Sequence, residues 1–293
     1  MSIMPSHRQG LYLLEHCRIM VKDEKLCYVR KEDALEKYWS LPYGNTNVLL
    51  LGSGTSLTQA AARLLASENV MVGFVGGGGT PLFLTTQSEY RPTEYMQGWI
   101  RHWPDPNWRL KVAKQLQLAR CQFIRKSWAK LEGLDAGSVE PLLNDYRQRI
   151  PGATTVEELM GNEAAFAKQL YRHLAQTLDI LWKARAPGTG SDLANQYLDH
   201  GNYLAYGLAA TALWVLGISH SLPVSHGMTR RGALVFDLAD TIKDGAILPN
   251  AFLAAKLRER DQAMRNRCVV FLDQSNALEF MFEQIKHALE VAA

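Results

Sequence analysis

The sequence predicts an α+β protein, with a mostly β N-terminal part followed by a helical C-terminal part. Through the first ninety or so residues, short apolar runs alternate with polar turns, a pattern typical of β-strands. From Tyr95 onward, apolar residues recur at spacings of three and four, which is the period of an amphipathic α-helix. We therefore expect the change from strand to helix near residues 90 to 97.

The composition fits a protein of two ordinary domains. A chain of 293 residues with 47% hydrophobic content can bury a substantial core, and a net charge of +3 by itself implies little about partners. The four cysteines are far apart and form no CxxC pair, which argues against a zinc site or a disulfide framework and favours a reducing cytosol. They are Cys17, Cys27, Cys121 and Cys268.

Neither export nor membrane insertion is indicated. The start, MSIMPSHRQG, lacks the apolar core of a signal peptide. The longest strongly apolar run, from Leu204 to Ile218, is too short and too rich in Ala and Thr to span a bilayer, so we expect a buried helix there. We expect a cytoplasmic protein with no membrane partner.

The β part is expected to contain strands in LYLLEHCRIMV, KLCYVR, TNVLLLG and VMVGFVG, with one helix between the last two. Thr55 or Ser56 can cap that helix, which ends before a strand at Val70. Its apolar positions are Leu57, Ala60, Ala61, Leu64 and Leu65.

The glycines around this helix resemble those of a dinucleotide-binding unit, in which a strand, a Gly-rich turn, a helix and a strand follow one another. The match is incomplete, because Leu57 stands where a third glycine belongs and no acidic residue ends the second strand. Gly52 and Gly54 are therefore interpreted as tight-turn residues, and so are Gly76 to Gly79. A nicotinamide-dependent enzyme is the most distant alternative.

A basic segment opens the helical part. Between Arg101 and Lys130 there is a single acid, Asp105. Two interpretations are open: a solvated helix face whose aromatic residues turn to the core, which the local pattern favours, or a DNA-binding face. The basic residues are Arg101, Arg109, Lys111, Lys114, Arg120, Arg125, Lys126 and Lys130, and the aromatic ones are Trp103, Trp108, Phe123 and Trp128.

Further helices follow. Residues Leu131 to Thr155 are expected to form a loop and an irregular helix. Thr155 to Glu158 fits a capping box, and Asp192 can cap a long run to about Val215. Residues Ala251 to Ala293 are expected to form two helices. The helix after the capping box places four residues on one stripe: Glu163, Ala167, Leu170 and Leu174. In the basic segment, the helical spacing likewise places on one stripe Val112, Leu116, Ala119 and Phe123.

The stretch SHGMTRRGALVFDLADTIKD gathers His226, Asp237 and Asp240 within fifteen residues, around the paired Arg230 and Arg231. If its second half is helical, both carboxylates lie on one side of the helix. Each of these residues alone has a structural explanation, since acids often act as partners of a helix dipole and a histidine is more often structural than a ligand. Their conjunction favours a site for chemistry on phosphate.

Glu163 adds a distant carboxylate, because an acid on an otherwise apolar helix face needs a cation or a hydrogen-bonding partner. Oxygen and imidazole ligands without cysteine favour Mg²⁺, with Mn²⁺ well suited to a site that contains histidine. Three protein ligands would leave positions for a phosphate oxygen and an attacking hydroxyl. His220, six residues before His226, is the competing histidine, and we expect it to have a supporting role.

Several long strings resemble one family, the CRISPR-associated integrase of spacer acquisition in its type I-F form. They are LLLGSGTSLTQAA, GGGGTPLF, SEYRPTEYMQGW, LDHGNYLAYGLAATALWVLGI and HGMTRRGALVFDLADTIKD, and the resemblance runs from about Leu11 to Phe280. It implies an N-terminal β-sandwich dimerisation domain, residues 1–92, and an α-helical catalytic domain that binds metal and DNA, residues 93–293. It also implies two homodimers assembled with a second adaptation protein, which in this subtype is fused to a helicase-nuclease.

The resemblance implies metal ligands at Glu163, His226 and Asp240, with Asp237 as a further catalytic residue, and Mg²⁺ or Mn²⁺ as the cofactor. The implied reaction serves antiviral defence: the 3′ hydroxyl of a prespacer duplex attacks a phosphodiester of the CRISPR repeat, next to the leader, by direct transesterification. Endonuclease activity on branched DNA follows from the same chemistry. The rival hypothesis is a non-catalytic DNA-binding scaffold.

The DNA-binding residues expected from the basic segment and the motif would contact phosphates largely without reading sequence. Tyr90, Arg91 and Trp99 are weaker candidates for contacts with frayed bases. The expected phosphate contacts are Arg109, Lys111, Lys114, Arg125, Arg230, Arg231 and Lys243.

Overall fold

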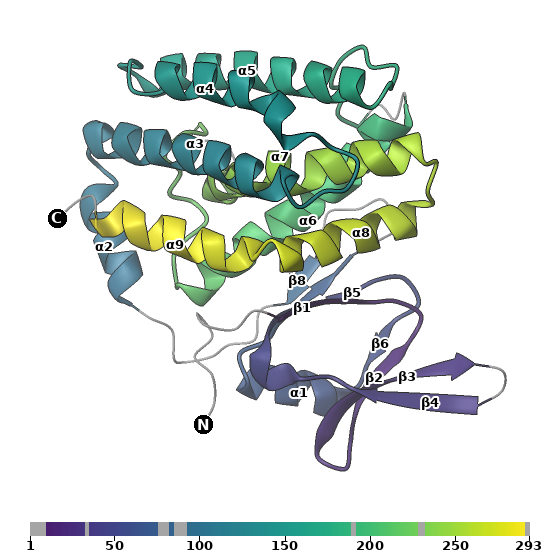
Figure 1. Ribbon diagram of the computed structural model, residues 1–293. Coiled ribbons are helices and arrows are strands. Elements are labelled where there is room, and N and C mark those ends of the chain that lie inside the picture. Colours follow the sequence, from purple (N-terminus) through teal and green to yellow (C-terminus); the bar gives the residue numbers. More distant parts are fainter. Residues whose placement is uncertain are drawn as a thin grey trace. The chain divides into compact units, whose positions relative to one another are not determined.

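The computed structural model describes residues 10–32, 35–75, 82–84, 93–188, 192–227 and 232–290. The chain divides into two compact units, Met1–Arg91 and Pro92–Ala293 (Figure 1). The division falls one residue before the predicted domain boundary. The first unit is built mainly from strands and the second from helices, which confirms the predicted α+β class.

The N-terminal unit contains two four-stranded sheets. In the first, β1 (Gly10–Leu14), β5 (Thr46–Leu51) and β7 (Met71–Phe74) run parallel, and β8 (Leu82–Leu84) pairs antiparallel with β7. Every residue of β5 is buried, as a central parallel strand covered on both faces should be. The second sheet has the order β4 (Leu35–Ser40), β3 (Lys25–Glu32), β2 (Arg18–Lys22) and β6 (Ser56–Leu57).

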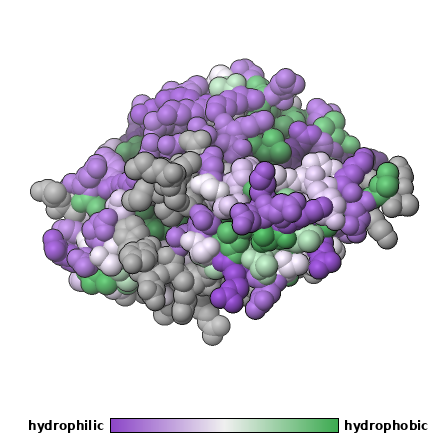
Figure 2. Space-filling model, turned by 90° about the horizontal axis from the view of Figure 1, so that it is seen from below, coloured by the Kyte–Doolittle hydropathy of each residue, from purple (hydrophilic) through white to green (hydrophobic). Residues whose placement is uncertain are grey.

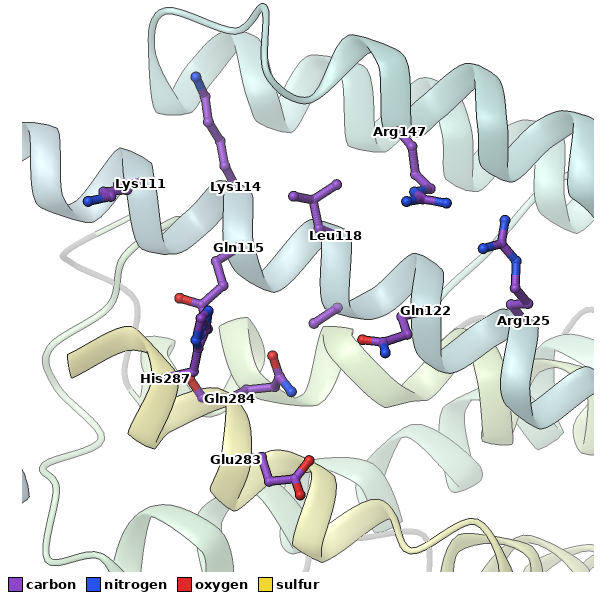
Figure 3. Close-up of a pocket in the computed structure, with 11 residues that line it drawn as sticks. Lys111, Lys114, Gln115, Leu118, Gln122, Arg125, Arg147, Glu283, Gln284 and His287 are labelled. Carbon is purple, nitrogen blue, oxygen red and sulfur yellow. The ribbon is translucent and has the colours of Figure 1, made fainter. Parts of the chain in front are cut away.

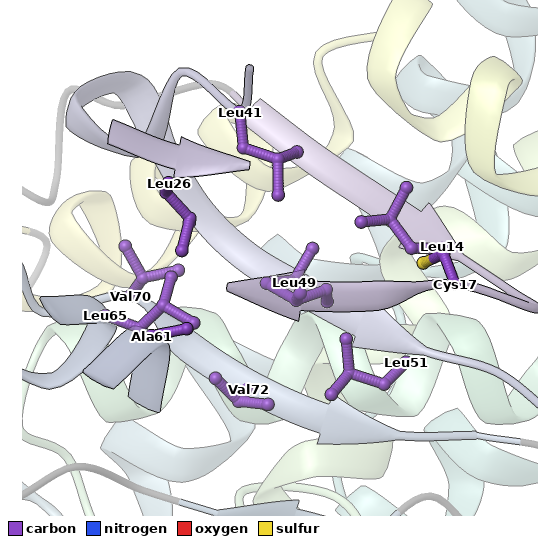
Figure 4. Packing of buried hydrophobic residues seen from close by; sticks show 11 residues of the cluster. Leu14, Cys17, Leu26, Leu41, Leu49, Leu51, Ala61, Leu65, Val70 and Val72 are labelled. Atoms are coloured by element: carbon purple, nitrogen blue, oxygen red, sulfur yellow. The ribbon is translucent and has the colours of Figure 1, made fainter. Parts of the chain in front are cut away.

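The two sheets share one hydrophobic core with α1 (Gln59–Ser67), shown in Figure 4. Leu49 and Val72 come from the first sheet, Leu26 from the second, and Ala61 and Leu65 from the helix. This arrangement confirms the predicted β-sandwich, because the inner faces of two sheets bury one another's apolar side chains.

The predicted cap of α1 is wrong by two or three residues. Thr58 caps the helix, since its Oγ1 accepts a hydrogen bond from the Ala61 backbone N–H at 3.3 Å. Ser56 and Leu57 instead form β6, where the Ser56 N–H donates to the Cys17 carbonyl at 2.9 Å. Thr55 donates its hydroxyl to the Leu14 carbonyl at 3.1 Å. Strand pairing with β2 therefore overrides the local helical pattern.

The tight-turn interpretation of Gly52 and Gly54 fits the structure. Gly54 has φ +69°, a left-handed conformation that favours glycine. At Gly52, a Cβ atom would come within 2.3 Å of the Glu15 side chain. Gly76 to Gly79 lie outside the described residues.

In the helical unit, α7 occupies the centre and is buried along nearly its whole length. It packs most extensively against α6 and α3, and it also contacts α5, α8 and α9 (Figure 1). The bounds are α2 (Glu94–His102), α3 (Pro106–Trp128), α4 (Glu140–Arg149), α5 (Val156–Thr177), α6 (Leu193–Val215), α7 (Ala233–Lys256), α8 (Asp261–Gln274) and α9 (Ala277–Glu290). The central helix therefore carries both aspartates of the motif.

Two predicted helix starts are confirmed. Thr155 caps α5 by accepting from the Glu158 N–H at 3.1 Å, and Asp192 caps α6 by accepting from the Asn195 N–H at 2.8 Å. The capping box is only half formed, because the Glu158 carboxylate accepts from the Thr154 N–H instead. Helix α7 continues to Lys256, beyond the expected start of the next helix, and the two predicted C-terminal helices follow as α8 and α9.

The apolar run from Leu204 is buried within α6, as predicted. No described helix combines the length and the apolar character that a membrane crossing requires. Figure 2 shows one face of the molecule, on which hydrophilic side chains predominate and hydrophobic ones gather only in small separate patches. The four cysteines are buried free thiols, so the predicted absence of a disulfide framework is confirmed.

Candidate active site

The predicted site residues come from three segments of the helical unit. Glu163 lies on α5, Asp237 and Asp240 lie nearly one turn apart on α7, and His226 lies in the segment that precedes α7. All four are buried or partly buried. Arg230 and Arg231, predicted to contact DNA, lie outside the described residues.

Asp237 fixes the segment that carries His226. Its Oδ2 accepts hydrogen bonds from the backbone N–H of Val224 at 2.7 Å and of Ser225 at 3.2 Å. Its Oδ1 accepts from the His226 N–H at 3.0 Å and lies 2.7 Å from the ring Nδ1 of His226. The carboxylate is fully buried, so both of its oxygens are occupied inside the protein.

This pairing determines which ring nitrogen of His226 is available. An ionised carboxylate can only accept, so Nδ1 carries the proton and Nε2 carries the lone pair. A metal-binding histidine is commonly oriented in this way, by a carboxylate on its other ring nitrogen. The geometry favours Asp237 as the residue that orients His226.

Asp240 forms an ion pair with Lys243, three residues further along α7, at 2.6 Å between Oδ1 and Nζ. Burial by itself would lower the pKa of Lys243, but the carboxylates of Asp240 and Asp244 raise it above the ordinary value. Lys243 therefore stays charged. It lies beside a predicted metal ligand, and its amine already has a protein partner.

Glu163 accepts a hydrogen bond from Arg120, at 2.5 Å between Oε1 and Nη1. Burial opposes ionisation of this carboxyl group, but Arg120 and Lys243 outweigh it and lower the pKa of Glu163, with a smaller contribution from His226. Glu163 is therefore ionised at neutral pH. These couplings also place Glu163 within electrostatic reach of His226 and Lys243.

The three predicted ligands share one neighbourhood without converging on a point. Among the described residues, no three His, Cys, Asp or Glu side chains gather closely enough to hold a metal ion, because Glu163 turns to Arg120 and Asp240 to Lys243. Each of these ion pairs engages one of the two carboxylate oxygens. The donor set, two carboxylates and an imidazole, fits Mg²⁺ or Mn²⁺.

Sequence reasoning missed the role of Arg120. It counted this residue within the basic segment, but the side chain is only 1% exposed and pairs with both Glu163 and Asp244. A signal was present, since Arg120 is four residues after Leu116 and three before Phe123, on the apolar stripe of α3. A cation on a buried stripe requires a carboxylate partner.

The basic segment is an exposed helix face with a buried aromatic side, as the local pattern favours. Trp108, Phe123 and Trp128 are buried. Trp99 is also completely buried, and its Nε1 donates to the Leu222 carbonyl at 3.1 Å. Trp99 is therefore a packing residue, which argues against its weaker candidacy for contacts with frayed bases. Tyr90 and Arg91 lie outside the described residues.

Three of the predicted DNA contacts line one groove of about 810 Å³ (Figure 3). Lys111, Lys114 and Arg125 line it from α3, and Arg147 lines it from α4. Lys114 also donates to the Pro151 carbonyl at 2.9 Å, and Arg125 pairs with Glu140. We call this surface, with Gln115, Leu118, Ala119, Gln122, Glu283, Gln284 and His287, the basic groove.

Arg109 does not line the basic groove. Its Nη1 donates to the carbonyl of Trp103 at 2.7 Å and to that of Pro104 at 3.3 Å. The guanidinium thus satisfies carbonyl groups at the end of α2 and the turn after it, which is a structural use of a predicted DNA contact.

The basic groove and Glu163 lie on opposite sides of α3. Leu118 faces the groove and Arg120 faces Glu163. Residues two positions apart in an α-helix point in directions that differ by roughly 200° around the helix axis. The groove residues of α3 therefore belong to a different surface from the candidate active site.

His220 plays a structural part: its ring hydrogen-bonds to the backbone of Ala210, and burial lowers its pKa.

The fold and the site define a protein with a β-sandwich and a helical domain that carries a cluster of acidic residues with one histidine. The sequence matches the family described as CRISPR associated protein Cas1 over residues 11–275, and the chain belongs to that family. It is 47% identical to the CRISPR-associated endonuclease Cas1 of Pseudomonas aeruginosa, over 97% of this chain and 94% of that protein. It is 44% identical to the same-named protein of Pectobacterium atrosepticum, over 97% and 93%.

The fold is also that of a solved member of the family. TtCas1 gives a TM-score of 0.72 at 25% identity, covering 95% of this chain and 96% of that chain. A TtCas1–DNA complex gives 0.71 at 24% identity, covering 94% and 90%.

Proposed function

We propose that this protein is a metal-dependent DNA endonuclease and integrase of type I-F CRISPR adaptation, which inserts short foreign duplexes into the CRISPR array in antiviral defence. The observation that carries the proposal is the buried Asp237 carboxylate, which orients His226 within electrostatic reach of the ionised Glu163. The extensive likeness to two proteins named as Cas1 endonucleases supports it.

Glu163, His226 and Asp240 would hold Mg²⁺ or Mn²⁺. Such an ion lowers the pKa of a bound hydroxyl and stabilises negative charge on phosphate. The chain's own residues prepare the site: Asp237 directs the lone pair of His226 to Nε2, and Arg120 keeps Glu163 ionised. Lys243 adds a positive charge next to Asp240, where a phosphate would approach.

The proposed reaction needs no protein nucleophile. The prespacer's 3′ oxygen forms a new bond to the phosphorus of the repeat while the bond to the existing 3′ oxygen breaks, so the number of phosphodiesters is conserved. The attacking hydroxyl loses its proton and the leaving oxygen gains one. Burial raises the pKa of Cys121 to about 11 and that of Cys268 to about 12, so neither thiol is a thiolate at neutral pH.

For DNA, we propose that the basic groove binds backbone phosphates away from the reacting bond. Its described lining contains four Lys or Arg side chains against one carboxylate, Glu283. Lys243 would act nearer the site, beside Asp240, and Arg230 and Arg231 stay predicted phosphate contacts. We also propose that the protein forms homodimers, and that two homodimers assemble around a second adaptation protein, which is fused to a helicase-nuclease.

The test is strand transfer of a labelled duplex into a supercoiled target, together with nicking of branched DNA, with Mn²⁺, with Mg²⁺ and with chelator. We expect activity only with a divalent ion, and its loss in folded His226→Ala and Asp240→Ala proteins. Retained activity in either variant would overturn the ligand assignment.

A non-catalytic scaffold is the second candidate, favoured by the ion pairs that already engage Glu163 and Asp240. It predicts DNA binding without cleavage whatever ion is present. Metal-dependent nicking by the wild-type protein excludes it.

A further inference from the structure

Arg120 joins three helices in the interior of the helical unit. Its Nε donates to Asp244 Oδ2 at 2.8 Å, and its Nη2 pairs with the same oxygen. Its Nη1 donates to Glu163 Oε1 at 2.5 Å. Arg120 belongs to α3, Glu163 to α5 and Asp244 to α7, so one guanidinium fixes the spacing of all three.

Further contacts restrain the guanidinium. Its Nη1 also donates to Gln117 Oε1 at 3.3 Å, and that oxygen accepts from the Tyr146 hydroxyl at 2.8 Å. The Arg120 guanidinium carbon lies 5.4 Å from the centre of the Phe166 ring, which stacks on Tyr146. An arginine fork is planar and rigid, so these partners leave it little freedom to rotate.

The two carboxylate partners of Arg120 are buried to different degrees. Asp244 is 1% exposed, whereas the Glu163 side chain is 18% exposed. Asp244 takes two of the Arg120 contacts and is the deeper partner, whereas Glu163 takes one and lies nearer to solvent.

Stability alone is a weak reason for such a network, since removing charges from water is costly and apolar residues often stabilise a core equally well. We infer that Arg120 and Asp244 are positioning residues of the candidate active site: Asp244 fixes Arg120, and Arg120 holds the Glu163 carboxylate in place for a divalent ion. Neither touches the ion or the DNA. The inference rests on the proposed function, since it assumes that Glu163 is a metal ligand.

The test is a double-mutant cycle on Mn²⁺ affinity, measured with the full chain and free Mn²⁺ followed by electron paramagnetic resonance. Asp244→Asn keeps the size of the side chain and one acceptor oxygen but removes its charge. We expect this variant to bind Mn²⁺ about 10-fold or more weakly, as is usual when a partner of a metal ligand is changed. In a Glu163→Gln background, the same change should have no further effect, because Asp244 acts through Glu163.

The matched control is Glu140→Gln. Glu140 is the carboxylate partner of Arg125, on the groove side of α3, as Asp244 is the partner of Arg120. It should leave Mn²⁺ affinity unchanged. Circular dichroism and thermal melts check folding. Arg120→Lys keeps the positive charge but loses the planar guanidinium that contacts both carboxylates. It can replace Asp244→Asn in the double-mutant cycle if that variant does not fold.

The outcomes separate the inference from the proposed function. If the wild type binds Mn²⁺ and Glu163→Gln weakens binding, but folded Asp244→Asn binds like the wild type, only the inference is overturned. An equal loss from Asp244→Asn with and without Glu163 also overturns it, since that pattern indicates a merely structural role. If the wild type binds no Mn²⁺, the proposed function fails first.

Discussion

The single carboxylate of Asp237 both satisfies backbone N–H groups and orients a side chain of the candidate site. It accepts three backbone N–H groups from the segment before α7, and it holds the ring of His226. A buried carboxylate needs this many donors to offset the loss of water. The same bonds that satisfy Asp237 therefore give His226 a fixed orientation, so stability and site geometry are linked at this residue.

Asp237→Asn tests this link. The amide keeps one acceptor oxygen, but its NH₂ group faces backbone N–H donors, so at least one hydrogen bond to a charged acceptor is lost. We expect the free energy of unfolding to fall by about 1.5–3 kcal/mol, and strand transfer to fall more than folding explains. Urea unfolding and strand-transfer rates measure the two effects. Asp145→Asn, in an exposed pair with Arg149, should cost less than about 1 kcal/mol, and an equal cost in both variants would contradict the argument.

At the scale of elements, α3 separates two different surfaces. One face carries Arg120 toward α5 and α7, and the opposite face lines the basic groove. A helix with its side chains is about 10–12 Å across, so DNA in the groove would be held by different residues from those that surround the candidate ligands. Groove variants should therefore change DNA affinity without changing the chemistry of the site.

The combined variant Lys111→Gln, Lys114→Gln and Arg147→Gln tests this separation. We expect weaker DNA binding at every sequence, and a plot of log affinity against log salt that is shallower by about 0.9 for each phosphate that the groove no longer neutralises. Mn²⁺ affinity should not change. The control is Lys168→Gln with Arg172→Gln, two exposed basic residues of α5 outside the groove. An unchanged salt slope in the groove variant would show that the groove is not a DNA surface.

At the scale of the whole molecule, ion pairs between helices supplement the apolar packing of the helical unit. Arg120 links α3, α5 and α7, Arg125 links α3 to Glu140 of α4, and His200 links α6 to Asp261 of α8. The last pair responds to pH. The hydrogen bond to Asp261 raises the pKa of His200. Burial would raise the pKa of Asp261, but His200 and Arg265 outweigh burial and lower it.

These shifts predict a stability window for the His200–Asp261 pair. Asp261 contributes above its ordinary pKa of 3.8 and loses its contribution as pH falls through the lowered folded value. His200 contributes fully below 6.5 and loses its contribution as pH rises through the raised value. A double-mutant cycle with His200→Gln and Asp261→Asn should show coupling at pH 5 and little at pH 9. Because both groups are partly exposed, we expect a coupling free energy of less than about 1 kcal/mol at pH 5. Equal coupling at both pH values would contradict the prediction.

The sequence by itself determined the change from strands to helices and the caps at Thr155 and Asp192, and it predicted the conjunction of Glu163, His226, Asp237 and Asp240. These features are local or are carried by motifs, because helix periods and caps depend on neighbours a few residues away. It misplaced the start of α1, where pairing with a strand some forty residues earlier prevails.

Only the tertiary structure decided which charges meet. Arg120 finds Glu163 at a separation of 43 residues and Asp244 at 124, and no local pattern contains those distances. The structure likewise separated Arg120 from the basic residues around it and placed Lys111 and Arg125 on the other side of α3. The physical reason is that an ionic group takes its partner from the helices packed around it, so its role is fixed only when those helices come together.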